Sequence, residues 1–139
     1  PEVVLDGVPV LEKDRIRAAI LNLESAGETK PAKALRLAYE RGRTHWIEGG
    51  NNRIFFASDG EFSLEDLNAV LAREAGSDLP LSVFYFGEME AGPLANMQTL
   101  ARRGQGEASH ITAQTVRQIL LRQTRYLRRQ QVAPATEDE

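Results

Sequence analysis

Apolar residues recur along the 139-residue chain at two spacings, one typical of helices and one typical of buried strands. The helical spacing, which gathers apolar side chains on one face, predicts five helices. They cover approximately residues 13–25, 31–44, 63–75, 94–103 and 112–129. Arg53–Ala57 and Leu81–Phe86 are rich in aromatic and β-branched residues and predict buried strands. Glu107–Ile111 is more polar and predicts a short strand nearer a sheet edge.

Helices that alternate with strands predict parallel strands joined by right-handed helical crossovers. The expected fold class is therefore α/β, with three layers in the order helix, sheet, helix. Val3–Val10 predicts an edge strand or a hairpin arm, because Asp6-Gly7 interrupts it and Pro9 closes it. We expect Ala34, Leu35, Ala38 and Tyr39 on the buried face of the second helix, with His45-Trp46-Ile47 packed at its end. Val116, Ile119, Leu120 and Leu127 form the expected apolar side of the last helix.

Asp59 stands just past the predicted Arg53–Ala57 strand and is followed at once by Gly60. Open α/β sheets bind their ligands at the carboxyl ends of their strands, so a carboxylate here is well placed to hold a cation. Glycine allows the sharp backbone turn that such a position needs. Asp59 could equally cap the turn that follows, and position alone leaves both readings open.

Composition narrows the range of functions only in part. Net charge is −3, from 17 basic and 20 acidic side chains, which gives no overall argument for nucleic-acid or membrane partners. The chain has no cysteine, which excludes disulfides and thiolate chemistry. No apolar run approaches the roughly 20 residues that span a bilayer. We expect one domain over residues 1–131, excised from a longer polypeptide, and a disordered acidic tail over residues 132–139.

A series of short motifs, in a consistent order and spacing, resembles a known family. The motifs are Val3-Val-Leu5, Pro9, Gly27-Glu-Thr29, Leu35, Ala38-Tyr39, Gly50-Asn-Asn-Arg53, Ser58-Asp-Gly60, Leu81-Ser-Val83, Phe86-Gly87, Leu100-Ala101 and Gly104-Gln-Gly106. Over about residues 1–111 they resemble the later two-thirds of a von Willebrand factor A (vWA) domain of the bacterial type. The resemblance implies a Rossmann-like fold, a protein-interaction module and no enzymatic activity.

Domains of this family carry a metal-ion-dependent adhesion site at the carboxyl edge of the sheet. The family pattern combines Asp-x-Ser-x-Ser after a first strand, a threonine from a second loop and Asp-Gly from a third. The resemblance gives Thr29 the role of the threonine and Asp59 that of the aspartate. It implies Mg²⁺ or Mn²⁺ in the complete domain, with an acidic side chain of a protein partner completing the octahedron.

The chain departs from the family pattern in two respects. It contains no Asp-x-Ser-x-Ser, and Glu28 stands where a small residue usually precedes the threonine. Glu28 is either an additional oxygen ligand or a solvent-facing acid. With only Thr29 and Asp59, the chain alone has too little charge to dehydrate Mg²⁺, so we expect weak or no metal binding. In the family, the first two strands of the sheet lie beside the strand that leads to Asp59. Without them the Arg53–Ala57 strand would have an open edge, which predicts that the chain is poorly stable alone or forms an edge-to-edge homodimer.

Two other functions remain as alternatives. Asp59 could serve a metal-dependent phosphoryl-transfer enzyme, although the chain lacks a Walker A loop, Gly-x-Gly-x-x-Gly and Asp-x-Asp. Phosphatase turnover that is lost in an Asp59→Ala variant would favour this enzyme. The chain could also be a structural scaffold without metal. An extracytoplasmic or membrane-tethered setting is implied by the family alone.

The remaining charged residues have ordinary interpretations alongside functional ones. Glu61, Glu88 and Glu90 follow predicted strands and either line the edge that holds Asp59 or are solvated loop acids. The last helix is basic, which indicates a solvated face or a surface for an acidic partner or phosphate. Its basic residues are Arg117, Arg122, Arg125, Arg128 and Arg129. His45 and His110 are interpreted as packing or surface residues rather than metal ligands.

Overall fold

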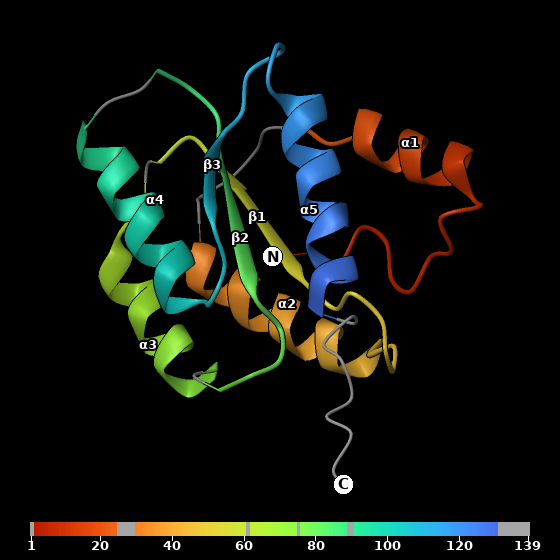
Figure 1. Ribbon diagram of the computed structural model, residues 1–139, viewed down its shortest axis with the longest axis horizontal. Coiled ribbons are helices and arrows are strands. Elements are labelled where there is room, and N and C mark those ends of the chain that lie inside the picture. The colour runs from red at the N-terminus through yellow and green to blue at the C-terminus, as the bar shows by residue number, and fades with distance from the viewer. Residues whose placement is uncertain (1, 25–29, 61, 75, 89–90, 131–139) are drawn as a thin grey trace, which may run out of the picture.

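The computed structural model describes residues 2–24, 30–60, 62–74, 76–88 and 91–130, with side chains as far as residue 123. Figure 1 shows the arrangement of its helices and strands. The described elements are α1 (Lys13–Leu21), α2 (Pro31–Thr44), β1 (Ile54–Ser58), α3 (Leu64–Glu74), β2 (Leu81–Tyr85), α4 (Ala91–Arg103), β3 (Ala108–His110) and α5 (Val116–Gln130). The α/β prediction is confirmed, and β1 begins one residue later than predicted. The first helix ends at Leu21, earlier than the predicted residue 25, since residues 22–24 are not helical. The tail at 132–139 lies outside the described residues.

The three strands form one parallel sheet in the order β1-β2-β3 (Figure 1). Ile54 is paired with Leu81, and Val83 is paired with Ala108. The central strand β2 is buried throughout, whereas Ile54 is the only fully buried residue of β1. β1 is therefore less buried than its sequence predicts, because β2 is its only partner among the described strands.

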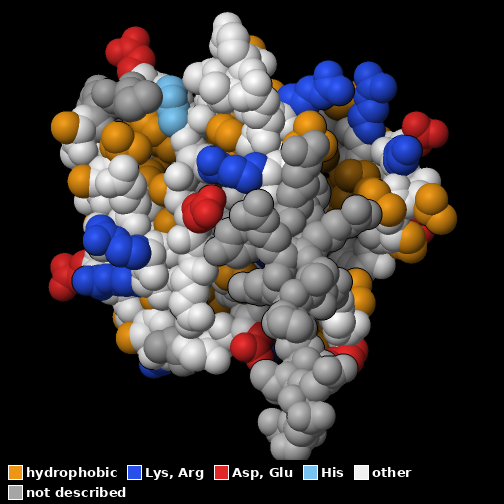
Figure 2. Space-filling view, in the orientation of Figure 1, with side chains coloured by type: hydrophobic (Ala, Val, Ile, Leu, Met, Phe, Trp, Pro, Cys, Tyr) orange, Lys and Arg blue, Asp and Glu red, His pale blue; other side chains and the backbone are white. Residues whose placement is uncertain are grey.

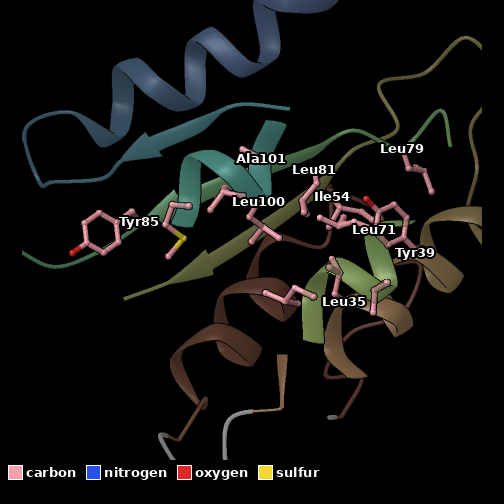
Figure 3. Packing of buried hydrophobic residues seen from close by; sticks show 13 residues of the cluster. Leu35, Tyr39, Ile54, Leu71, Leu79, Leu81, Tyr85, Leu100 and Ala101 are labelled. Carbon is pink, nitrogen blue, oxygen red and sulfur yellow. The ribbon is translucent and has the colours of Figure 1, made fainter. Parts of the chain in front are cut away.

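Alternating residues of the sheet face a core covered by α2, α3 and α4. From the strands the core takes Ile54, Leu81, Val83 and Tyr85, with Phe56 and Ala108 packed against it. From the helices it takes Leu35, Tyr39, Leu67, Val70, Leu71, Met97, Leu100 and Ala101 (Figure 3). The predicted faces of α2 and α3 are thus largely confirmed, except that Ala34 is exposed. Period-two strands and 3.6-period helices bury these residues as one contiguous apolar cluster.

Tyr39 is 2% exposed, and its burial predicts an unusual pH dependence of stability. Desolvation, with a smaller contribution from the Glu74 carboxylate, raises the pKa of Tyr39 from 10.0 to about 12. The unfolded chain loses this proton near pH 10, so the stabilisation is complete below that pH and is lost as pH rises towards 12. We expect about 2 kcal/mol to be lost over this window, as judged by urea unfolding at a protein concentration at which two copies are paired. A Tyr39→Phe variant lacks the phenol, and its unfolding free energy should be correspondingly flatter over the same window.

The other face of the sheet meets α5 through polar side chains. Arg53 donates hydrogen bonds to Gln123 and to the Ser82 hydroxyl, at 3.1 Å for the latter. Ser82 is completely buried and Gln123 is 3% exposed. Of the expected apolar side of this helix, Val116 and Ile119 are half-buried, whereas Leu120 is 45% exposed. Gln123 instead supplies an oxygen acceptor to the half-buried Arg53 guanidinium and to the buried Ser82 hydroxyl.

The N-terminal region differs most from its prediction. Residues 2–10 form no strand, and the prediction of an edge strand over Val3–Val10 is wrong. Gly7 has φ +57°, and the neighbouring Asp6 carboxylate accepts from Arg41 at 3.2 Å and lies 2.7 Å from His45 Nε2. These contacts attach the segment to the end of α2, and no described strand lies beside it to form a ladder.

Apolar side chains of α1 and the residues around it are left at the surface. No residue of α1 is buried, and Leu11, Ile20, Leu21 and Leu23 are 86%, 60%, 71% and 60% exposed. Figure 2 shows apolar side chains beside basic ones on the side of the molecule where α1 lies in Figure 1. The helical period of α1 is confirmed, but among the described residues its apolar stripe has no core to join.

Candidate functional site

Asp59 lies at the carboxyl end of β1, as predicted, and its side chain is exposed. The turn that presents it is built by its neighbours. The Gly60 amide donates to the Ser58 hydroxyl at 3.1 Å, and the Phe62 amide donates to the Gly60 carbonyl at 3.0 Å. The Ser58 side chain therefore fixes the backbone on either side of Asp59, which directs the carboxylate away from the core.

Gly60 is required by both its conformation and its surroundings. Its φ of +97° is a conformation that residues with a Cβ rarely adopt. A Cβ at this position would lie 2.8 Å from Cβ of Pro93, in the first turn of α4, and 3.4 Å from the ring of Tyr85. The Asp59-Gly60 turn thus packs against the first turn of α4 and the ring of Tyr85, while the Asp59 side chain is exposed.

The ends of β2 and β3 reach the same edge of the sheet and are tied to each other. Nε2 of His110 donates to the carbonyl of Gly87 at 2.8 Å, and the His110 ring lies 5.4 Å from that of Tyr85. The Tyr85 hydroxyl donates to the carbonyl of Glu88. Both contacts hold the loop after β2, so His110 is a packing residue, in line with its interpretation from sequence. The sequence around His110 does not predict its hydrogen bond to the Gly87 carbonyl.

The described residues around Asp59 supply too few ligands for a metal centre. Among them no group of three or more His, Cys, Asp or Glu side chains is placed to hold a metal ion. Thr29 and Glu28, the other predicted ligands, lie outside the described residues, as do Glu61 and Glu90. Glu88 is exposed at the same edge. One carboxylate beside an engaged serine hydroxyl supplies fewer oxygen ligands than Mg²⁺ or Mn²⁺ requires.

The other predicted residues include the basic side chains of α5 and His45. Arg117 is exposed on α5, whereas Arg122 donates to the Ser109 hydroxyl at 3.2 Å and lies 3.5 Å from Glu107. Side chains of the three later arginines of α5 lie outside the described residues. His45 contacts Asp6 at the opposite end of the molecule. The helices that the structure describes include none long and apolar enough to cross a membrane.

Comparison with known proteins finds a partial relative whose name states no function. No protein-family model matches the chain. The chain is similar to an uncharacterized protein, YfbK, of Escherichia coli strain K12, with 31% identity over 114 residues. The match covers 78% of this chain and 20% of YfbK, so the chain spans about a fifth of the length of that relative.

Proposed function

We propose that this chain is the later part of a vWA-type protein-interaction domain whose binding edge is centred on Asp59. The observation that carries the proposal is the Asp59-Gly60 turn, which lies at the carboxyl end of β1 in a parallel sheet. The order β1-β2-β3 and α5 on the sheet face opposite α2, α3 and α4 support a three-layer arrangement of the kind that the motif order implies. The domain binds a partner and does not catalyse a reaction.

The outer edge of β1 is where the rest of such a sheet would join. The Ile54 amide donates to the Pro80 carbonyl and the Ser58 carbonyl accepts from the Phe86 amide, so residues 54, 56 and 58 bond towards β2. Phe55 and Ala57 then direct their backbone groups away from β2. Phe55 is also 50% exposed, which leaves apolar area beside this edge. An additional strand on this edge would pair those groups and cover Phe55.

A strand added to the outer edge of β1 would also complete the metal site. A strand that runs parallel to β1 on its outer edge ends next to Asp59, because the carboxyl ends of parallel strands meet. Asp-x-Ser-x-Ser at its end, with Thr29 and Asp59, would give the number of oxygen ligands that Mg²⁺ or Mn²⁺ needs. The partner's acidic side chain would then bind to the metal. These residues come from polypeptide outside the 139 residues, since the sequence lacks the motif.

The open edge of β1 gives the first test of this proposal. A strictly monomeric sample of the 139-residue chain should lack a sharp thermal transition, and at higher concentration two copies should pair through β1. Ala57→Pro removes an outward amide without touching the β1–β2 ladder, so it should abolish pairing in light-scattering measurements. Ala57→Ser keeps the amide and should still pair. A cooperative transition in the monomer would contradict the proposal of an incomplete sheet.

A further inference from the structure

A pocket lies at the amino-terminal end of the sheet, opposite to the edge that carries Asp59. It has a volume of about 430 Å³ and is formed by the end of α2, the end of α3 and the loop before β2. Trp46 and Leu79 supply its apolar surface; Leu79 is 3% exposed, while 41% of Trp46 remains accessible. We refer to it below as the Trp46 pocket. The expectation that His45-Trp46-Ile47 pack at the end of α2 is wrong for Trp46 and Ile47, because Ile47 is 66% exposed and the indole borders this pocket.

The walls of the Trp46 pocket are held in place by local contacts. The Ser77 amide donates to the Glu74 carbonyl at 2.9 Å, and the Leu79 amide donates to the Ser77 hydroxyl at 3.1 Å. The indole N–H of Trp46 donates to the Glu48 carboxylate at 3.2 Å, which orients the ring. An oriented indole beside an apolar floor binds a flat or branched apolar group with little loss of side-chain entropy.

The charges around the pocket are not equally available. Arg43 is paired with Glu74, whose side chain is only 14% exposed, so this pair links α2 to α3 and is already neutralised. Arg73 is exposed, and among the described residues it has no hydrogen-bond or ion-pair partner. Asp78, on the opposite loop, is also exposed. With one available guanidinium and one carboxylate in its lining, the pocket suits a singly charged anion better than a polyphosphate, which Asp78 would repel more strongly.

We propose that the Trp46 pocket binds a peptide segment in which an apolar side chain lies next to a single carboxylate. The apolar side chain contacts Trp46 and Leu79, and the carboxylate binds to Arg73. Because Trp46 and Arg73 lie at the amino ends of the strands, this site is independent of Asp59 and of the metal. The chain then presents two separate binding surfaces, one at each end of its sheet.

Trp46 is the only tryptophan in the sequence, so its fluorescence reports on this pocket directly. The probe is the blocked dipeptide acetyl-Phe-Asp-amide, titrated into the full chain. We expect a saturable change in Trp46 emission, with at least tenfold weaker binding of acetyl-Phe-Asn-amide and no saturable binding of ADP. Equal binding of the two dipeptides, tighter binding of ADP, or no saturable change would overturn the proposal.

Variants separate binding at the pocket from a general effect of charge. Arg73→Gln should weaken binding of the acidic dipeptide at least fivefold, because it removes the available guanidinium. Arg102→Gln changes an equivalent residue in the last turn of α4 and should leave the affinity unchanged. Asp59→Ala should also leave it unchanged, so failure of this proposal and failure of the metal site can be told apart. Equal losses in Arg73→Gln and Arg102→Gln would refute a specific contact.

Discussion

Replacing Gly106 by alanine is expected to unfold the domain or to destabilise it by roughly 3–5 kcal/mol, the upper range for single substitutions. A Cβ on Gly106 would lie 2.1 Å from the carbonyl oxygen of Leu81 and 3.0 Å from the amide nitrogen of Ser82. Both atoms belong to the backbone of the buried central strand β2, which cannot move aside as a flexible side chain can. The measurement is the midpoint of urea unfolding, followed by circular dichroism at a protein concentration at which two copies are paired.

The reason for so large an effect is that the loop before β3 forms part of the hydrogen-bond pattern of β2. The Leu81 amide donates to the carbonyl of Gly104 at 2.7 Å, and the Val83 amide donates to that of Glu107 at 2.8 Å. Any shift that makes room for a Cβ must lengthen these bonds, and the buried groups then have no water to replace them.

A matched glycine provides the control. Gly92 lies in α4, and among the described residues no atom beyond its chain neighbours and the backbone of its own helix would come within 4 Å of a Cβ there. Gly92→Ala should therefore change stability by less than about 1 kcal/mol, and in the stabilising direction, because alanine favours helix more than glycine does. Equal destabilisation by Gly106→Ala and Gly92→Ala would show that the close approach to Leu81 is not what matters.

The strands and most of the helices could be predicted because their sequence periods agree with their burial. β2 illustrates this, since Leu81–Tyr85 is an apolar run that is buried on both faces of the sheet. β1 has a similar sequence but is half exposed, because burial depends on a neighbouring strand that a local pattern does not reveal. The position of Asp59 was predictable because it depends on a local signal, the end of an apolar strand followed by glycine.

Contacts between distant segments could not be predicted. The apolar period of α5 includes Leu120, which is exposed, and does not include Gln123, which contacts Arg53 and Ser82. Even a half-buried guanidinium needs oxygen acceptors, and here this requirement outweighs the burial of one leucine. The Val3–Val10 prediction failed through a similar long-range contact, in which Asp6 binds to the end of α2. The Trp46 pocket likewise joins α2 to a loop more than thirty residues later in the chain.

The candidate site was predicted only in part, for a simple physical reason. Asp59 is a single carboxylate on an exposed turn, and its local geometry is the same whether it binds a metal or only ends a strand. What distinguishes these two roles is the identity of the neighbouring oxygen atoms. Those oxygens come from other loops, and in this account some come from a strand outside the 139 residues.

Manganese binding tests the account most directly. The protein to use is a fusion in which an apolar strand ending in Asp-x-Ser-x-Ser is joined to the amino end of this chain by a flexible linker. Mn²⁺ titration followed by electron paramagnetic resonance gives the number of ions bound and their affinity. We expect one site, with an affinity at least 100-fold higher than that of the 139-residue chain, because the added strand supplies three further oxygen ligands.

The decisive comparison is between two variants of that fusion protein. Asp59→Ala should lower the Mn²⁺ affinity at least tenfold, whereas Glu88→Ala, at the neighbouring exposed acid of the same edge, should leave it unchanged. A fusion protein that binds Mn²⁺ no more tightly than the chain alone, or whose affinity is unaffected by Asp59→Ala, would contradict the account.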